Sequence, residues 1–514
     1  MQKLPVGIQS FREIREKGYL YIDKTEQVYS LISASKYTFL SRPRRFGKSL
    51  LISTIKELFL GSRKLFEGLW VSDQWDWTET HPVIQVGFSS LGYETIGLEK
   101  AIEVELDAQA SRLGIALSAT IYDRKFKELI EKTFEKHGQV VILVDEYDKP
   151  LIDYLGADLE KAKAHQKILE AFYGVIKDAD PFIQFMMVTG VSRFSKVSIF
   201  SDLNNLHDIS RHQDYSDMLG ITEEEITDYL GEYLDRIEEE KGISSDLLRA
   251  QMRDWYNGYS WDGETRVYNP FSLLIFCSER EFKNYWFETG TPSFLLALMK
   301  QASYYQLENL EVDELAFSAY DIENLRALPI LFQTGYLTIR EKKKFGQYLL
   351  DYPNKEVRDA MYGYLIGDLR QEDPSFSSSL IMKIGRAFSE NNLEELMLLF
   401  QTLFARIPYD LFIANLEAYY HSLLYLTFQF LGSFQVESEV HTNRGRIDAV
   451  VHTAKDIYVI EFKLDEPASV ALAQIHDRQY AERFRDAEKT VHLLGISFGS
   501  KERSVVDWVE EILA

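Results

Sequence analysis

The stretch that decides the fold of the N-terminal region is Tyr37–Phe59, which reads YTFLSRPRRFGKSLLISTIKELF. An apolar run leads into a basic loop, and an amphipathic run follows from about Lys48, so the stretch predicts a strand, a loop and a helix. The general phosphate-binding loop is G-x-x-x-x-G-K-[ST], and Gly47, Lys48 and Ser49 fit it while Arg42 replaces the first glycine.

The chemistry of this loop suits a nucleotide. Gly47 lets the backbone approach a phosphate closely, Lys48 can reach the β- and γ-phosphates, and the Ser49 hydroxyl can bind Mg2+. The N-terminus of the following helix adds N–H donors and a favourable dipole. The alternative is a basic turn that contains GKS by chance, and the placement between strand and helix counts against it.

A second apolar run, VVILVDEYDKPLI at Val140–Ile152, ends in two carboxylates and is typical of a Walker B strand. We expect Asp145 to hold Mg2+ and Glu146 to orient or deprotonate the attacking water, because phosphoryl transfer depends on positioning and charge stabilisation. The alternative is a pair of carboxylates that only cap the next turn.

A third apolar run, FMMVTG at 185–190, is followed by Arg193, which could neutralise charge on the γ-phosphate. Lys196 and the pair Arg44–Arg45 compete for that role, and a solvated surface arginine is the alternative. The residues expected to contact nucleotide are Arg45, Phe46, Gly47, Lys48, Ser49, Asp145 and Arg193.

Composition limits the classes of protein. The chain has 514 residues, 46% hydrophobic and 27% charged, which predicts packed domains, roughly three or four of them. Its single cysteine, Cys277, excludes an internal disulfide and a cysteine-based zinc site. The net charge of −23 repels nucleic acid on average, so any DNA or RNA partner requires a local basic surface.

Neither a secretory signal nor a membrane span is expected. Charges interrupt the first residues, and the most apolar long run, 411–434, contains Asn415, Glu417, His421 and Gln429. This run predicts a buried helix, and the chain is expected to be cytoplasmic.

Four domains are expected along the chain. Alternating strands and helices at 1–215 predict an α/β P-loop domain with a parallel sheet. A helical lid should follow at 216–300, beginning at Thr222 with Glu225 in capping-box spacing. Helices and then two strands at 301–365 predict a winged-helix-like module, with Lys342, Lys343 and Lys344 in its wing; these lysines either touch phosphate or merely solubilise a hairpin. An α/β domain is expected at 375–514.

Carboxylates in two apolar strands mark this C-terminal domain. One strand carries Asp448, and IYVIEFKL carries Glu461 and Lys463, which project to one face. The carboxylates can hold Mg2+ and Lys463 can assist the attacking water, as in phosphodiester hydrolysis. D-x(n)-E-x-K is weak alone, and two solvated carboxylates are the alternative, but unpaired charges in apolar strands are costly.

A resemblance covers nearly the whole chain. GIQSFREIREKGYLYIDKTEQVYSLI, SRPRRFGKSLLISTI, VDEYDKPLI, TGVSRFSKVSIFSDLNNL, WYNGYSW, VYNPFSLL and YWFETGTPSFLL resemble successive motifs of a bacterial AAA-ATPase-like family. The resemblance implies a P-loop core akin to AAA and STAND-type signalling ATPases, and a C-terminal PD-(D/E)XK nuclease-superfamily domain. RPRRFGKS is the family's own form of the loop, and the VSR segment resembles the sensor arginine.

The same resemblance extends to supporting residues. Gln474 and Tyr480 follow the spacing of the Q-x(5)-Y element of some PD-(D/E)XK domains, and Glu417 matches their additional acid, with a paired buried acid as its alternative. Tyr21, Asp23 and Lys24 match an N-terminal family motif whose role stays open, an adenine or ribose contact being one option.

Two functions remain in view. The first is an ATPase that regulates a nuclease, with ATP and Mg2+ as cofactors and Mn2+ as a substitute for Mg2+. The second is a signalling or scaffold protein in which nucleotide state controls assembly, for instance of a homo-oligomer, while the C-terminal domain binds nucleic acid or a partner without cleaving it.

Overall fold

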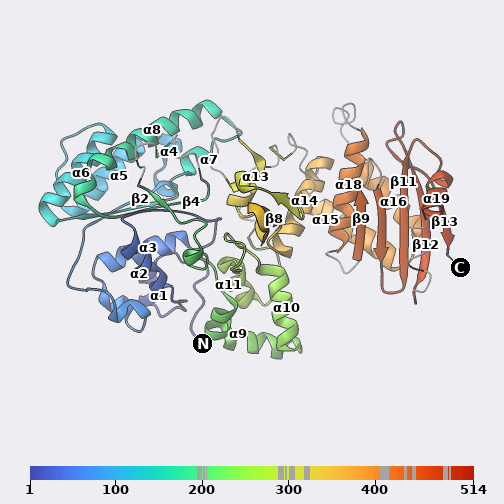
Figure 1. Ribbon diagram of the computed structural model, residues 1–514, viewed down its shortest axis with the longest axis horizontal. Helices are drawn as coiled ribbons and strands as arrows, with labels where there is room; N and C mark the ends of the chain where they lie inside the picture. The colour runs from blue at the N-terminus through green and yellow to red at the C-terminus, as the bar shows by residue number, and fades with distance from the viewer. Residues whose placement is uncertain are drawn as a thin grey trace. The chain divides into compact units, whose positions relative to one another are not determined.

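The computed structural model contains two compact units, Met1–Val357 and Arg358–Ala514 (Figure 1). It describes the chain except for 194–198, 201–202, 204, 287–294, 296–297, 300–306, 318–324, 406–415, 433–436, 443–446, 479–483, 485–487 and 514. At 416–421, 437–442 and 447–448 it describes the backbone alone.

A five-stranded parallel sheet forms the centre of the first unit, in the order β2-β3-β4-β1-β5. The predicted apolar runs form four of its strands because side chains on both faces are buried. Parallel strands end at one edge, so the segments after β1, β3 and β4 meet there. The strands are β1 Tyr37–Ser41, β2 Val83–Gly87, β3 Val140–Asp145, β4 Ile183–Gly190 and β5 His207–Asp208.

Helices cover both faces of this sheet (Figure 1), as the α/β prediction requires. On one face lie α1 Phe11–Glu16, α2 Thr25–Ala34 and α3 Lys48–Phe59. On the other face lie α4 Tyr93–Ile96, α5 Leu98–Leu113, α6 Tyr122–His137, α7 Lys149–Ile152 and α8 Leu159–Asp178.

Three helices follow, as predicted for the lid, and pack around their own apolar cluster. Thr222 and Glu225 form the expected capping box at the start of the first of them. The helices are α9 Glu223–Lys241, α10 Ser245–Tyr256 and α11 Pro270–Glu279. The boundary at 215/216 stays a prediction.

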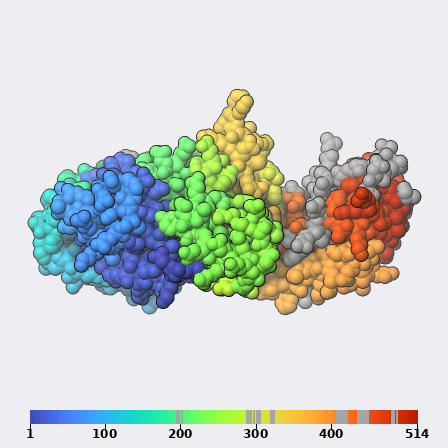
Figure 2. All heavy atoms as spheres, turned by 90° about the horizontal axis from the view of Figure 1, so that it is seen from below, coloured from blue at the N-terminus to red at the C-terminus, as the bar shows by residue number. Residues whose placement is uncertain are grey.

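A three-stranded antiparallel sheet in the order β6-β8-β7 completes the first unit. The expected hairpin is present and protrudes from the surface (Figure 2), with Phe345 fully exposed at its tip. The winged-helix class stays a prediction, because the helices expected before the sheet fall largely outside the described residues. The elements are β6 Leu310–Val312, α13 Ala327–Gln333, β7 Thr338–Lys342 and β8 Tyr348–Asp351.

The second unit is built on a mixed sheet in the order β13-β12-β11-β10-β9. One face packs on α19 and the other on α15, α16 and α18. The strands are β9 Glu437–Thr442, β10 Ile447–His452, β11 Asp456–Leu464, β12 Thr490–Gly499 and β13 Ser504–Ile512. The helices are α14 Lys355–Arg370, which begins in the first unit, α15 Pro374–Ser389, α16 Leu393–Phe404, α18 Leu416–Leu431 and α19 Ala468–Asp477.

The apolar run at 411–434 contains α18, whose described side chains are mostly buried, as predicted. Within the part of the chain that the structure describes, no helix combines the length and apolar character needed to cross a bilayer.

Candidate functional site

The phosphate-binding loop turns sharply between β1 and α3. Arg45 and Gly47 have positive φ angles of 68° and 91°, and α3 begins at Lys48. Gly47 adopts this conformation easily, whereas Arg45 does so at a cost of about 1–3 kcal/mol, which is typical of a functional loop. Such turns at a helix N-terminus aim backbone N–H groups into one concavity that favours anions.

Lys48 lies inside this loop. Its Nζ donates to the carbonyl oxygens of Arg42 and Pro43, both at 2.9 Å. The side chain is only 5% exposed, and burial lowers its pKa while the nearby carboxylates oppose that shift. The ammonium group therefore sits where phosphate oxygens could replace two carbonyl partners.

Arg42 occupies the position of the first glycine in the general phosphate-binding loop motif. Its side chain is buried and makes structural contacts. Its guanidinium donates to the carbonyl oxygens of Ser210 at 2.6 Å and Tyr215 at 3.2 Å, and lies 4.0 Å from the ring centre of Trp261. Burial lowers its pKa to about 9. The sequence showed the departure from the pattern but gave no signal for these distant partners.

Asp145, the last residue of β3, and Glu146, which follows it, reach the same edge of the sheet. Asp145 accepts a hydrogen bond from Thr189 Oγ1 at 2.6 Å, and Glu146 has a positive φ of 54°. Glu146 lines the pocket in front of the loop together with Lys48 and Ser49. The structure thus brings the predicted loop and the predicted acids together.

Asp148 is a site residue that the sequence reasoning missed. Its buried carboxylate accepts from the backbone N–H groups of Val191 and Ser192 at 3.0 and 2.7 Å, and from Ser192 Oγ at 2.5 Å. Burial raises its pKa, against the effect of these bonds and of Lys48. Asp148 therefore joins the loop after β3 to the segment after β4. The sequence could have indicated this residue, because it is the third acid of VDEYD.

Arg193 points to other partners. Its guanidinium pairs with Asp208 at 2.7 Å and its backbone N–H donates to Gln333 Oε1 at 2.7 Å. Among the described residues that line the pocket, the cations near the loop are instead Arg44, Arg45 and Lys48, together with Lys149. The sensor role of Arg193 stays a prediction, and Lys196 lies outside the described residues.

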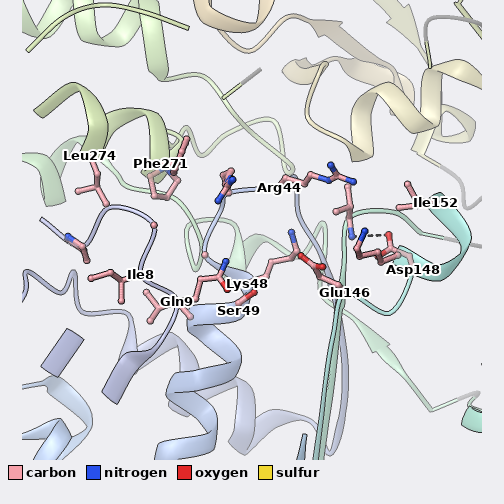
Figure 3. Close-up of a pocket in the computed structure, with 18 residues that line it drawn as sticks. Ile8, Gln9, Arg44, Lys48, Ser49, Glu146, Asp148, Ile152, Phe271 and Leu274 are labelled. Carbon is pink, nitrogen blue, oxygen red and sulfur yellow. Dashed lines mark hydrogen bonds between the residues drawn. The ribbon is translucent and has the colours of Figure 1, made fainter. Parts of the chain in front are cut away.

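The pocket has a volume of about 380 Å³. Figure 3 shows Lys48 and Ser49 at the start of α3. Glu146 and Asp148 lie on one side of them, and Phe271 and Leu274 lie on the other. Charged and apolar groups both line the pocket: Ile152 lies beside Asp148, and the Arg45 guanidinium lies 4.7 Å from the centre of the Phe271 ring.

A mostly apolar cavity of about 120 Å³ lies next to the pocket and shares Pro5, Gly47, Leu50, Pro270 and Leu274 with it. It is also lined by members of the N-terminal motif and neighbouring apolar residues, including Tyr21, Ile22, Lys24, Phe46, Leu219 and Ile221.

The N-terminal motif has two structural roles. Asp23 accepts from the backbone N–H and the hydroxyl of Thr25 at the start of α2. Lys24 pairs with Glu225 at 2.5 Å and donates to the carbonyl oxygen of Asp217 at 2.8 Å. Tyr21 and Lys24 line the apolar cavity, whereas Asp23 holds the local backbone.

The C-terminal candidates gather on β10 and β11. The antiparallel register pairs Asp448 directly with Glu461. Glu461 is fully buried, and its Oε1 lies 3.3 Å from Lys463 Nζ. Gln474, on α19, donates to Glu461 and accepts from Lys463. The side chains of Asp448 and Glu417 and all of Tyr480 lie outside the described residues.

Gly495 lets α19 approach the sheet, and the sequence reasoning did not identify it. It pairs with Glu461 in the parallel β11–β12 register, and a Cβ at this position would lie 2.4 Å from the carbonyl oxygen of Ala468. A glycine within an apolar strand was the available signal.

Among side chains that the structure describes, no group of three or more His, Cys, Asp or Glu is arranged to hold a metal.

Comparison with known proteins agrees with this division of the chain. Residues 5–200 match the model of a family described as predicted AAA-ATPase, and 415–508 match the PD-(D/E)XK nuclease superfamily. An uncharacterized protein from the vnfD 5' region of Azotobacter chroococcum mcd 1 is 41% identical, over 100% of this chain and 99% of that protein. The chain belongs to this AAA-ATPase-like family.

Two solved structures match the chain with low TM-scores. The Walker-type ATPase of Pyrococcus abyssi is 14% identical with a TM-score of 0.33, covering 65% of this chain and 93% of that one. The ORC1 protein of Aeropyrum pernix, solved in complex with DNA, is 10% identical with a TM-score of 0.26, covering 82% and 86%.

Proposed function

We propose that the first unit of this AAA-ATPase-like protein binds and hydrolyses ATP. The observation that supports it best is one pocket in which the loop at 45–49 faces Glu146 and Asp148 at the carboxyl edge of a parallel sheet. Ligands of α/β proteins bind at this edge, and the P-loop motif is suited to phosphate.

The charged residues of the pocket suit the triphosphate. Lys48 would exchange its carbonyl partners for phosphate oxygens, and the Ser49 hydroxyl and Asp145 carboxylate are hard oxygen ligands of the kind Mg2+ prefers. Bound Mg2+ would neutralise charge on the phosphates during transfer. Glu146 lines the pocket and would orient the attacking water and accept its proton.

The apolar cavity beside the pocket suits the base. A purine ring is flat and apolar on its faces, and the cavity beside the loop is lined by Tyr21, Ile22, Leu274 and other apolar side chains. The cavity adjoins the pocket through Gly47, so one nucleotide could occupy both. This arrangement favours ATP over a ligand that carries phosphate alone.

Calorimetric titration with MgATP tests this proposal. Lys48→Ala should remove detectable affinity, because the phosphate charge loses its buried cation. Lys56→Ala on the same helix is a matched control, since Lys56 contacts Gln85 and does not line the pocket. Parent-like affinity in Lys48→Ala would exclude the site.

For the second unit we propose Mg2+-dependent cleavage of nucleic-acid phosphodiester bonds. Paired positions in an antiparallel ladder share a face, so Asp448 and Glu461 are neighbours on β10 and β11, and Lys463 lies on that face as well. The two carboxylates would hold the metal, which would activate water, and Lys463 would stabilise charge on the phosphorus centre.

Plasmid nicking in Mg2+ or Mn2+, with and without ATP, tests this second activity. Parent protein should nick the plasmid and Lys463→Ala should not. Nucleic-acid binding without cleavage by parent protein under every condition would favour the signalling or scaffold function instead.

A further inference from the structure

The outer side of the phosphate-binding loop is held by residues far along the chain. Gly335 packs so closely that a Cβ there would lie 2.6 Å from Pro43 Cγ. Phe46 packs against the rings of Tyr259 and Trp261 at 4.8 and 5.4 Å. The loop is therefore supported by Tyr259, Trp261 and Gly335, which do not line the pocket or the apolar cavity, and its conformation depends on those supports.

A polar contact from Trp286 also holds a peptide of the loop. Trp286 Nε1 donates to the carbonyl oxygen of Arg44 at 3.0 Å, and Trp286 is only 5% exposed. A trans peptide is planar, so the carbonyl of Arg44 and the N–H of Arg45 point in opposite directions. Holding the carbonyl on the indole therefore directs the Arg45 N–H away from Trp286.

That peptide matters for phosphate binding. Arg45 has a positive φ of 68° and lines the nucleotide pocket with Arg44. Successive N–H groups in such a turn form the anion-binding concavity, so rotating this one peptide would replace a donor with a carbonyl oxygen. A carbonyl directed at phosphate would repel it.

Trp286 is itself positioned by a buried carboxylate at the start of α14. Glu356 Oε1 accepts from the backbone N–H groups of Tyr285 at 2.7 Å and Trp286 at 2.8 Å, and from Ser272 Oγ at 2.9 Å. Glu356 is 0% exposed, so water does not compete with its carboxylate for these donors. Losing it would leave both backbone N–H groups without this partner, and the one of Trp286 is buried, where an unsatisfied donor costs about 1–3 kcal/mol.

We propose that Glu356 and Trp286 are positioning residues of the nucleotide site, which orient the Arg44–Arg45 peptide for phosphate binding. The inference rests on the ATP binding proposed above. It makes nucleotide affinity dependent on the first turn of α14, the helix that continues past Val357 into the second unit.

Titration calorimetry of the full-length protein with MgATP tests whether the contacts from Glu356 to Trp286 and from Trp286 to Arg44 support nucleotide binding. Trp286→Phe removes the indole donor and keeps an aromatic ring, and it should weaken binding by about tenfold, the effect of one hydrogen bond of about 1.4 kcal/mol. Glu356→Ala should weaken binding at least as much. Glu356→Gln keeps an acceptor oxygen and should bind within about twofold of the parent.

A purely structural role predicts a different pattern. Irreversible misfolding would lower the fraction of binding-competent chains while the remaining chains kept the parent Kd, whereas mispositioning raises Kd at unchanged stoichiometry and with a free energy of unfolding that still keeps the chain folded. Combining Trp286→Phe with Glu356→Ala should cost no more affinity than the stronger single variant, because both act on one peptide. Trp77→Phe, which removes an indole donor from the carbonyl oxygen of Ser72 and does not touch the pocket, is the matched control and should bind as the parent does.

Two results would overturn the inference: Trp286→Phe with the parent Kd, or Glu356→Gln as weak as Glu356→Ala. If the parent chain itself fails to bind MgATP, the proposed function fails instead, so the two failures are distinguishable.

Discussion

Replacing Glu356 by Gln should change how the free energy of unfolding of the first unit depends on pH. Burial raises the pKa of this carboxyl group to about 7 from an ordinary value of 4.5, against the effect of its three hydrogen-bond donors. Because the folded-state pKa is the higher one, protonation stabilises the folded chain. That stabilisation is fully present below pH 4.5 and is lost as the pH rises through 7.

The two pKa values set the size of the effect. A difference of about 2.5 corresponds to a limit of about 3.4 kcal/mol, at about 1.36 kcal/mol for each pKa unit. Linkage over the narrower interval from pH 5 to pH 8 leaves about 2.5 kcal/mol. The stability of the parent relative to Glu356→Gln should therefore fall by about that amount between pH 5 and pH 8.

Urea unfolding followed by tryptophan emission at several pH values measures this difference. Trp508 is the one tryptophan of seven beyond Val357, so the emission reports mainly on the first unit. Glu224→Gln, which changes an exposed carboxylate, is the control and should keep the parent's pH profile. A parent-minus-variant difference that is flat from pH 5 to pH 8, or that grows with pH, would refute the reasoning.

The remaining predictions concern the two sites and the exposed hairpin. Glu146→Gln should retain MgATP and lower the turnover rate by about 10²-fold, measured by phosphate release; parent-like turnover would assign the proton transfer to another group. Replacing the lysines at 342–344 with serine should flatten the salt dependence of DNA binding, and an unchanged slope would leave them as solubilising residues. In the second unit, Asp448→Ala should lose both Mn2+ binding and cleavage, whereas Lys463→Ala should lose cleavage alone, since an ammonium group cannot ligate a metal; loss of Mn2+ binding in Lys463→Ala would contradict that division.

Local patterns in the sequence were sufficient for much of the fold. The apolar runs at 37–40, 83–88, 140–144 and 185–188 each form a strand of the parallel sheet. Such runs are informative because a strand buried on both faces must be apolar along its length. The α/β fold class follows from runs of this kind, whereas the family and the C-terminal PD-(D/E)XK match were indicated by the resemblance of the quoted motifs to those of known families.

Candidate site residues could be predicted where they belong to a short contiguous motif. Gly47, Lys48 and Ser49 lie at a helix start in one pocket with Glu146, as their motifs indicated. The pairing of the C-terminal carboxylates also follows from the strand pattern, although its register is set by the whole sheet.

Only the tertiary structure determined the supports of these sites. Arg42 donates to the carbonyl oxygen of Ser210, about 170 positions along the chain. Trp286 donates to the carbonyl oxygen of Arg44, 242 positions away, and Glu356 accepts from Ser272, 84 positions away. Arg193, which follows β4, pairs with Asp208 on β5, although β1 lies between these strands and the motif of Arg193 does not indicate this partner. The amino-acid sequence by itself determined which segments are strands, helices and phosphate loops, because backbone propensity, hydrophobic period and motif spacing are local properties. The partners of buried charges were decided by the tertiary structure, because a buried group bonds to whichever segment the fold brings within about 3 Å, at any distance along the chain.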